Sequence, residues 1–334
     1  MMCVRKEVDS YMIEQVLSER KDPFGILQST KYVIEHADSV TIHPGRIRQL
    51  ANQIRRKLSR NDVLTEEQFG RNAVNPQKVF LEDVVNFCFW TIPGKEKWNI
   101  EYPDGCVSDG WHALVACFDR ALDEEVPVLD TSYLVAVTDK DVASLFRGRH
   151  DTEIPLLEKR GEFLREAGNA LMNGYDGSVE KLLERADYNA VNIVREILRM
   201  FPSFRDMSHY KGEKVSLLKR AQIAAYDISL LPDVTIQDTE HLTIFADYKL
   251  PQILRGFGIV KYDPRLADKV NSYTILEANS PEEVEIRAST IWACELIAHE
   301  IGKPPVLVDN ALWHLSQDME KELAPYHRVL STYY

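Results

Sequence analysis

The clearest structural signal in the sequence is the stretch Ser280-Pro281-Glu282-Glu283, which opens a run that continues through Trp292 and Leu296 to Gly302-Lys303-Pro304-Pro305. A serine before the first turn, a proline within that turn and a glutamate three residues after the serine are typical of a helix N-terminus. Glycine and proline are typical of a helix end. The stretch therefore predicts a long helix between residues 280 and 302.

Further helix signals lie elsewhere in the chain. Asn75 and Pro76 begin a second predicted helix, and Thr138 with Asp141 caps a third. A fourth segment, which ends at Pro202, carries apolar residues at helical spacing: Val191, Val194, Leu198 and Phe201.

Strand signals are few. Two short segments, 98–102 and 106–108, flank Pro103-Asp104-Gly105 and predict a small hairpin. The β-branched run from Tyr133 to Val137 predicts one more short strand. We therefore expect a mainly α protein with a minor β element.

Length and composition indicate one folded protein. The chain has 334 residues, of which 45% are hydrophobic, which is enough for a solid core. It carries no repeat or flexible linker, so we expect a single domain over residues 1–334, with the charged loop at 148–152 as the place of any subdivision. The charged N-terminal residues 1–20 include no apolar signal region, and no segment has the roughly 18 apolar residues of a membrane span. These features predict a cytoplasmic protein without a membrane partner.

Cysteine and histidine usage gives no sign of a metal centre. The five cysteines form no Cys-x-x-Cys pair, and most have apolar neighbours, as buried thiols do. They are Cys3, Cys88, Cys106, Cys117 and Cys294. The nine histidines are scattered without the spacing of metal ligands. We expect neither disulfides nor a metal, and no organic cofactor.

The net charge argues against a nucleic-acid partner. A formal charge of -12 repels polyanions, whose binding depends on Lys and Arg. One basic group could form a local patch: Arg46, Arg48, Arg55 and Arg56. On a helix such arginines more often form a solvated face, and we predict that here.

Familiar catalytic motifs are missing, which directs attention to carboxylates. The sequence has no Gly-x-Gly-x-x-Gly, no phosphate loop, no His-Glu-x-x-His and no Gly-x-Ser-x-Gly. Asp247 instead stands in an otherwise apolar and aromatic run, Thr243 to Gln252. Such an acid is a helix cap, a partner of a distant cation or a working group. Composition alone favours a cap for a helix that begins near Pro251.

Two further segments carry candidate site residues. Asn310, His314 and Asp318 line one predicted helical face, with Asp309 at the helix start. This face is either a solvated surface or the wall of a polar pocket. In the second segment, Lys219 and Arg220 are adjacent cations in a helical pattern, and either could bind a phosphate.

A larger pattern connects these segments. The chain contains, in this order, Asn86-Phe87-Cys88-Phe89-Trp90, Arg120-Ala121-Leu122-Asp123, Phe201-Pro202-Ser203-Phe204-Arg205-Asp206, Lys219-Arg220-Ala221-Gln222-Ile223, Phe245-Ala246-Asp247-Tyr248, Glu283-Val284-Glu285-Ile286-Arg287, His327-Arg328 and Tyr333-Tyr334. With these motifs the sequence resembles the queuosine salvage family of queuosine 5'-phosphate N-glycosylases, from about the first helix to the last residue.

The resemblance implies a mostly helical enzyme, related in architecture to helix-hairpin-helix DNA glycosylases. It implies hydrolysis of queuosine 5'-monophosphate to queuine and ribose 5-phosphate, with Asp247 as the catalytic carboxylate and Phe245 against the base. A carboxylate in a dry aromatic site can stabilise the oxocarbenium-like transition state of glycosidic cleavage.

The resemblance also implies a base site in the segment 309–318, formed by Asp309, Asn310, His314 and Asp318. Queuine has a protonated amine and a diol, which acidic side chains can bind. The chain departs from the family pattern at Asn310 and His314, where Tyr and Asp are common. His43 is a further candidate for contact with the base.

For the 5'-phosphate, charge alone suggests Lys219 first, and His327 and Arg328 second. Two other functions stay open: a non-catalytic binding protein for queuine or another 7-deazapurine, and a glycosylase that acts on modified bases in nucleic acid.

Overall fold

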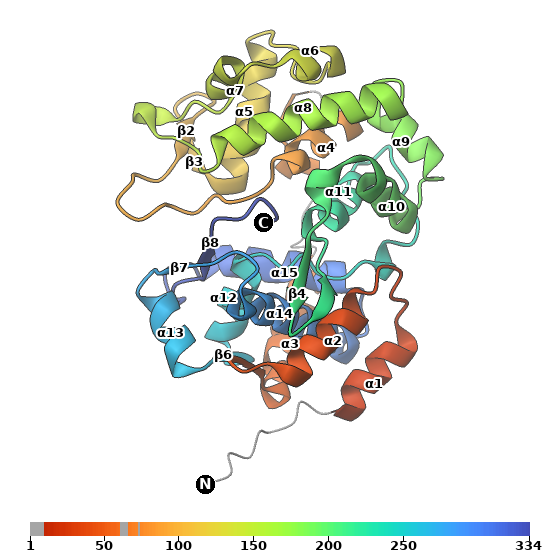
Figure 1. Cartoon of the computed structure of the whole chain (residues 1–334), viewed down its shortest axis with the longest axis vertical. Helices are drawn as coiled ribbons and strands as arrows, with labels where there is room; N and C mark the ends of the chain where they lie inside the picture. Colours follow the sequence, from red (N-terminus) through yellow and green to blue (C-terminus); the bar gives the residue numbers. More distant parts are fainter. Residues whose placement is uncertain (1–9, 61–65, 73) are drawn as a thin grey trace. The chain divides into compact units, whose positions relative to one another are not determined.

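The computed structural model describes residues 10–60, 66–72 and 74–334, and within them the chain is mainly α-helical (Figure 1). Each sheet among the described residues consists of two strands. Residues 1–9 of the charged N-terminal segment, including Cys3, lie outside the described residues. The four described cysteines are free thiols, and Cys106 is the exposed one among them. Among the described residues, no helix combines the length and the apolar composition that crossing a membrane requires.

Contacts between residues divide the chain into two compact units, each made of separate segments. The first unit consists of Met1–Val63, Met207–Leu217 and Glu240–Val329. The second unit consists of Leu64–Asp206, Leu218–Thr239 and Leu330–Tyr334. The loop at 148–152, where the sequence suggests a subdivision, lies within the second unit.

The first unit is built around α14 (Pro281–Ile301), the helix that the sequence predicts most clearly. Ser280 caps it by accepting a hydrogen bond from Glu283 N at 3.4 Å, and Gly302 ends it with a φ of 64°. The Glu283 carboxylate accepts from Asn279 N, one residue before the expected capping-box donor. From Glu283 to Ala298 every residue is buried. The following helices surround α14 (Figure 1): α1 (Ser10–Glu19), α2 (Ile26–His36), α3 (Ile47–Ser59), α12 (Lys249–Gly256) and α15 (Pro305–Asp318).

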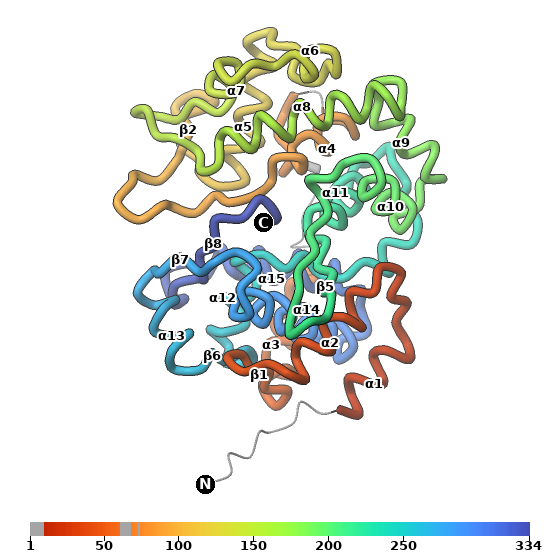
Figure 2. The backbone as a smooth tube through the Cα atoms, viewed as in Figure 1, coloured from red at the N-terminus to blue at the C-terminus, as the bar shows by residue number. Residues whose placement is uncertain are grey.

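Short strands and one more helix, α13 (Pro264–Asn271), complete the first unit. The strands β1 (Val40–Ile42) and β6 (Val260–Tyr262) pair antiparallel, and the two segments lie side by side in Figure 2. A hairpin packs on α2 and consists of β4 (Met207–Tyr210) and β5 (Glu213–Ser216). The parallel pair consists of β7 (Ile275–Leu276) and β8 (Arg328–Val329).

The carboxylate of Glu285, on α14, binds the backbone at the start of β1. It accepts hydrogen bonds from the backbone N of Asp38, Ser39 and Val40 at 3.1, 2.7 and 3.1 Å. The hydroxyl of Tyr210 donates a fourth bond at 2.7 Å. A buried carboxylate with this many donors is well compensated for its loss of hydration.

The remaining described α-helices lie in the second unit. They are α4 (Pro76–Val84), α5 (Gly110–Asp123), α6 (Thr131–Ala136), α7 (Asp139–Leu145), α8 (Leu157–Gly174), α9 (Val179–Arg185), α10 (Ala190–Met200) and α11 (Lys219–Ser229). The predicted caps at Asn75 and Thr138 are confirmed, and α10 ends before Pro202 as predicted. The predicted hairpin is also confirmed, as β2 (Asn99–Glu101) paired with β3 (Val107–Asp109).

One secondary-structure prediction is wrong. The run from Tyr133 to Val137 is not a strand, because α6 includes all of it except Val137. Asp130 caps this helix by accepting a hydrogen bond from Ser132 N at 2.8 Å. A local cap and packing against α8 outweigh the β preference of Val135 and its neighbours.

Buried arginines hold together the loop that follows α4. Arg160 donates to the carbonyl groups of Val85, Phe87 and Cys88, and its guanidinium lies 4.3 Å from the centre of the Phe87 ring. Arg220 donates to the carbonyl groups of Val84 and Ser203. The motif at residues 86–90 is therefore fixed through its main-chain oxygens.

Candidate active site

Asp247 lies in the loop that leads into α12. Its Oδ1 accepts hydrogen bonds from Lys249 N at 2.8 Å and from Leu250 N at 3.1 Å. The side chain is half-buried. The sequence-based interpretation of Asp247 as a helix cap is confirmed, although the helix begins at Lys249, two residues before Pro251. Capping a helix is compatible with a second role for the same carboxylate.

Two buried side chains hold the backbone just before Asp247. Asp309, on α15, accepts a hydrogen bond from Phe245 N through Oδ2 at 2.8 Å. Arg287, on α14, donates from Nε to the carbonyl oxygen of Ala246 at 3.1 Å. Three successive residues of the loop are therefore each fixed by a hydrogen bond to a different element. Rigid support of this kind is what a catalytic side chain needs.

The sequence interpretation did not single out Arg287. A signal was present, because Arg287 follows Glu283 by four residues within the predicted helix, a spacing that brings the two side chains together. Arg287 Nη1 lies 3.7 Å from Glu283 Oε1, and both side chains are almost fully buried.

Two of the predicted site acids, Asp247 and Asp309, act electrostatically on the same buried residue of α14. Burial raises the pKa of the Cys294 thiol well above its usual value, and the charges of Asp309, Glu295 and Asp247 raise it further. The carboxylates of Asp247 and Asp309 therefore lie within electrostatic reach of one buried side chain. The first unit thus gathers Phe245, Asp247 and Asp309 around α14.

Aromatic side chains border the loop. The rings of Tyr248 and Tyr326 are 4.8 Å apart between centroids, and Lys249 Nζ lies 5.5 Å from the centre of the Tyr326 ring. Phe245 is buried. The loop therefore adjoins apolar ring surface.

The predicted polar face of α15 is buried at one end and exposed at the other. Asp309 is 6% exposed and Asn310 is 1% exposed. His314 is half-buried, with its ring 5.4 Å from that of Trp313. Asp318 is 62% exposed at its side chain and forms an ion pair with Lys57 Nζ at 2.9 Å. The position of Asp318 is that of a surface residue, so we exclude it from the site proposed below.

His43 directly follows β1, in the loop before α3, as the sequence predicts. Its backbone N donates to the Ile259 carbonyl oxygen at 2.7 Å, and its Nε2 lies 3.4 Å from the Thr41 hydroxyl. The arginine-rich helix beyond it behaves as a solvated face, because all four arginines of the suspected patch are exposed.

The two candidate cations near the C-terminus differ in charge. His327 is buried, and burial together with the charge of Arg287 lowers its pKa to about 3. A neutral imidazole cannot supply the positive charge that we expected from it at a phosphate. Arg328 is half-buried, and its guanidinium lies 4.4 Å from the centre of the Tyr273 ring.

Lys219 belongs to the second unit and is the first residue of α11. Its side chain is buried, and its Nζ lies 3.5 Å from the Asn86 carbonyl oxygen. Burial raises the pKa of nearby Asp83 to about 7, while the side-chain hydrogen bond from Asn86 and the charges of Lys219 and Arg220 oppose that rise. Lys219 is thus a buried side chain whose charge acts on the Asp83 carboxyl.

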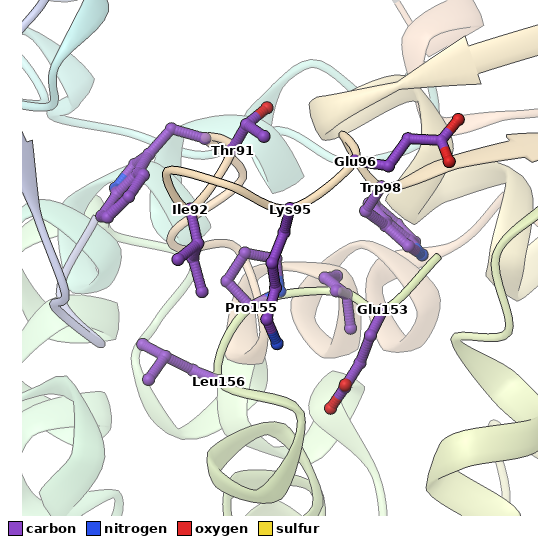
Figure 3. Close-up of a pocket in the computed structure, with 10 residues that line it drawn as sticks. Thr91, Ile92, Lys95, Glu96, Trp98, Glu153, Pro155 and Leu156 are labelled. Carbon is purple, nitrogen blue, oxygen red and sulfur yellow. The ribbon is translucent and has the colours of Figure 1, made fainter. Parts of the chain in front are cut away.

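Two pockets lie away from these residues, one in each unit. In the second unit, Trp90, Trp98 and Pro155 help to line a pocket of about 70 Å³ (Figure 3), which is too small for a nucleotide. The first unit has a pocket of about 380 Å³ whose lining includes acidic and basic side chains. Two of them, Arg20 and Glu295, form an ion pair at 3.0 Å. We assign no ligand to either pocket.

Possible metal ligands come together at one place in the described part of the chain. Asp238, Glu240 and His241 each bring one ligand atom to within 4.8 Å of the others. Asp238 already accepts a hydrogen bond from Asn189 Nδ2 at 2.7 Å. Exposed acids often lie this close without a metal, so this group carries no assignment.

The class of protein follows from comparison with known sequences. The family model described as queuosine salvage protein matches residues 70–334, and the chain belongs to this family. It is 37% identical to the queuosine 5'-phosphate N-glycosylase/hydrolase of Sphaerobacter thermophilus over 330 residues, which is 95% of this chain and 100% of that protein. Proteins with the same name from Bos taurus and Schizosaccharomyces pombe are 30% and 29% identical, with 92% of this chain and 98% and 99% of theirs covered.

Proposed function

We propose that this chain is an N-glycosidase that hydrolyses queuosine 5'-monophosphate to queuine and ribose 5-phosphate, which releases queuine for tRNA modification. The names of relatives aligned over nearly the whole chain support this activity. The structural observation that carries it is the loop at Phe245, Ala246 and Asp247, fixed at three successive residues beside buried aromatic rings.

Asp247 is the proposed catalytic carboxylate. Cleavage of the bond between the ribose anomeric carbon and the base leaves positive charge on the sugar, and water supplies the hydroxyl for the carbon and the proton for the base. A fixed carboxylate stabilises that charge without first having to reorganise. The two backbone N–H groups on Oδ1 stabilise the negative charge of Asp247 and fix its orientation.

For the base we propose Phe245, Asp309, Asn310, His314 and His43. Asp309 supplies a carboxylate for the cationic amine of queuine, although one of its oxygens also holds the Phe245 backbone. Asn310 and His314 follow on the same helix, with Asn310 in the buried half.

For the 5'-phosphate we propose Lys219 and Arg328. The formal charge of -12 favours a small ligand with one phosphate over a nucleic acid, because a single phosphate needs only a few local cations. The family match spans segments of both units, which supports one functional domain. The mainly helical content supports, at the level of fold class, the proposed relationship to helix-hairpin-helix glycosylases.

A direct assay tests the function. The protein is incubated with queuosine 5'-monophosphate, and the products are separated by liquid chromatography. We expect queuine and ribose 5-phosphate in equal amounts. An unchanged substrate peak with protein that is folded by circular dichroism would contradict the proposal, and tight queuine binding without hydrolysis would replace it with a carrier function. Binding of an oligonucleotide with steep salt dependence would point to nucleic acid as the substrate.

A further inference from the structure

We propose that Arg287 is a positioning residue for Asp247, which acts through its hydrogen bond to the Ala246 carbonyl oxygen. This inference rests on the proposed function, because it concerns the step that Asp247 carries out.

The contact is specific in its geometry. Arg287 Nε donates to Ala246 O at 3.1 Å, and the Arg287 side chain is 1% exposed. The carbonyl group of Ala246 and the N and Cα of Asp247 lie in one peptide plane, because the peptide bond is planar. A bond that fixes the Ala246 oxygen therefore fixes the direction from which the Asp247 side chain leaves the backbone.

Two other contacts hold this loop at neighbouring points. Asp309 holds Phe245 N, one peptide earlier, and the cap bonds of Asp247 hold its Oδ1 relative to α12. With the side chain tied to α12 and the preceding peptide tied to α14, the Asp247 carboxylate is held between two helices of the first unit.

Arg287 carries its charge into the interior of the first unit. Its side chain is 1% exposed, and its Nη1 lies 3.7 Å from Glu283 Oε1. A buried charged group needs hydrogen bonds and ion pairs to offset its lost hydration. The Nε hydrogen bond to the Ala246 carbonyl oxygen is one of these contacts, and it joins the guanidinium to the active-site loop.

Three variants test this inference. Arg287→Lys keeps the charge but removes the Nε donor at its place. Glu283→Gln keeps Arg287 and removes its acidic partner. The matched control is Arg20→Lys. Arg20 forms an ion pair with Glu295, which lies on α14 as Arg287 does. Arg20 also donates a hydrogen bond to Leu242 O at 2.9 Å, three residues before Phe245.

For each variant, kcat and KM on queuosine 5'-monophosphate, the dissociation constant for queuine and the melting temperature are measured. We expect Arg287→Lys to lower kcat by about 10- to 100-fold, since a misplacement of about 1 Å can cost about 100-fold. The dissociation constant for queuine should stay within about threefold, since the base contacts are intact. The control should lower the melting temperature and leave kcat within about twofold.

The outcomes separate the possibilities. Equal losses of kcat in Arg287→Lys and in the control, or a loss of queuine affinity as large as the loss of kcat, would overturn the inference. If Arg287→Lys does not fold, Glu283→Gln decides: unchanged kcat overturns the inference, and a lower kcat at constant queuine affinity sustains it.

A second comparison uses the Asp247→Asn background. A residue that acts through Asp247 should have little further effect there, because effects within one catalytic unit are not additive. An equal loss in both backgrounds would overturn the inference. A wild-type enzyme without turnover would instead overturn the proposed function, which distinguishes the two failures.

Discussion

Asp247 shows how one side chain can be both structural and functional. As a cap it accepts two backbone hydrogen bonds at the start of α12. The same bonds orient its carboxylate, so the stability of the helix and the geometry of the proposed site depend on one rotamer. The cap and the working group, two of the three alternatives that the sequence left open, are thus compatible.

Two substitutions separate these roles. Asn can still accept the cap bonds through its side-chain oxygen, so Asp247→Asn should keep the melting temperature while kcat falls by at least about 100-fold. Asp247→Ala should lose both activity and about 1 kcal/mol of unfolding free energy. Turnover assays and thermal melts measure these effects. A loss of the melting transition in Asp247→Asn would show that the residue is structural only.

His327 predicts a pH dependence of stability. Its pKa falls from 6.5 to about 3 in the folded protein, so the unfolded chain binds more protons between these values. The free energy of unfolding should therefore decrease as pH falls from 6.5 towards 3, with a contribution of about 1.4 kcal/mol per pH unit.

Denaturant unfolding at several pH values between 7 and 4.5 checks this, with His327→Gln and His209→Gln compared. The free energy of unfolding should depend less steeply on pH in His327→Gln than in the wild type. Substitution of the exposed His209 should leave that dependence unchanged. An identical slope in wild type and His327→Gln would contradict the expected neutral imidazole.

At the scale of elements, α14 organises the first unit. Its carboxylates and Arg287 reach three neighbouring segments: the start of β1 through Glu285, the loop at Ala246 through Arg287, and Arg20 through Glu295. A buried helix with these polar side chains specifies the register of its neighbours as well as their packing.

Glu285 gives the clearest stability prediction at this scale. Glu285→Gln places an amide donor among four donors, so we expect a loss of about 3 kcal/mol in unfolding free energy. The matched control is Glu282→Gln on the same helix, which breaks the part-exposed ion pair with Lys269 and should cost less than about 1 kcal/mol. Urea unfolding measures both variants. Equal losses would show that the four bonds to Glu285 contribute little.

The success of sequence prediction depends on how local the determinants are. Helices with caps in adjacent residues, such as those at Asn75, Thr138 and Ser280, are predicted correctly. The error at Tyr133–Val137 arose because residue preference was read without the cap at Asp130. Arg287 was missed because its carbonyl partner lies 41 residues away in the chain. The division into two units was also hidden, since each consists of segments that meet only through tertiary contacts.

At the scale of the whole molecule, charge distribution decides how an acidic protein can bind an anion. A chain with a formal charge of -12 must provide cations locally. Lys219, which is buried, is our first candidate.

We therefore expect Lys219→Met to raise KM for queuosine 5'-monophosphate by about 10- to 100-fold, the range for loss of a hydrogen bond to a charged group. Affinity for queuine, which has no phosphate, should not change. Lys181→Met is the matched control, since it makes the same change of net charge in the same unit at a side chain that is 50% exposed. An unchanged KM in folded Lys219→Met would transfer the phosphate assignment to Arg328.

The packing of α2 and α3 against α14 also has a consequence for biosynthesis. These two helices are made early, but the helix that covers their apolar faces follows roughly 220 residues later. At a synthesis rate of about 5–20 residues per second, about 10–45 s pass before α14 has been made and can cover those faces. Newly made chains are thus exposed to aggregation during that interval, and chaperones that bind the first 60 residues would protect them.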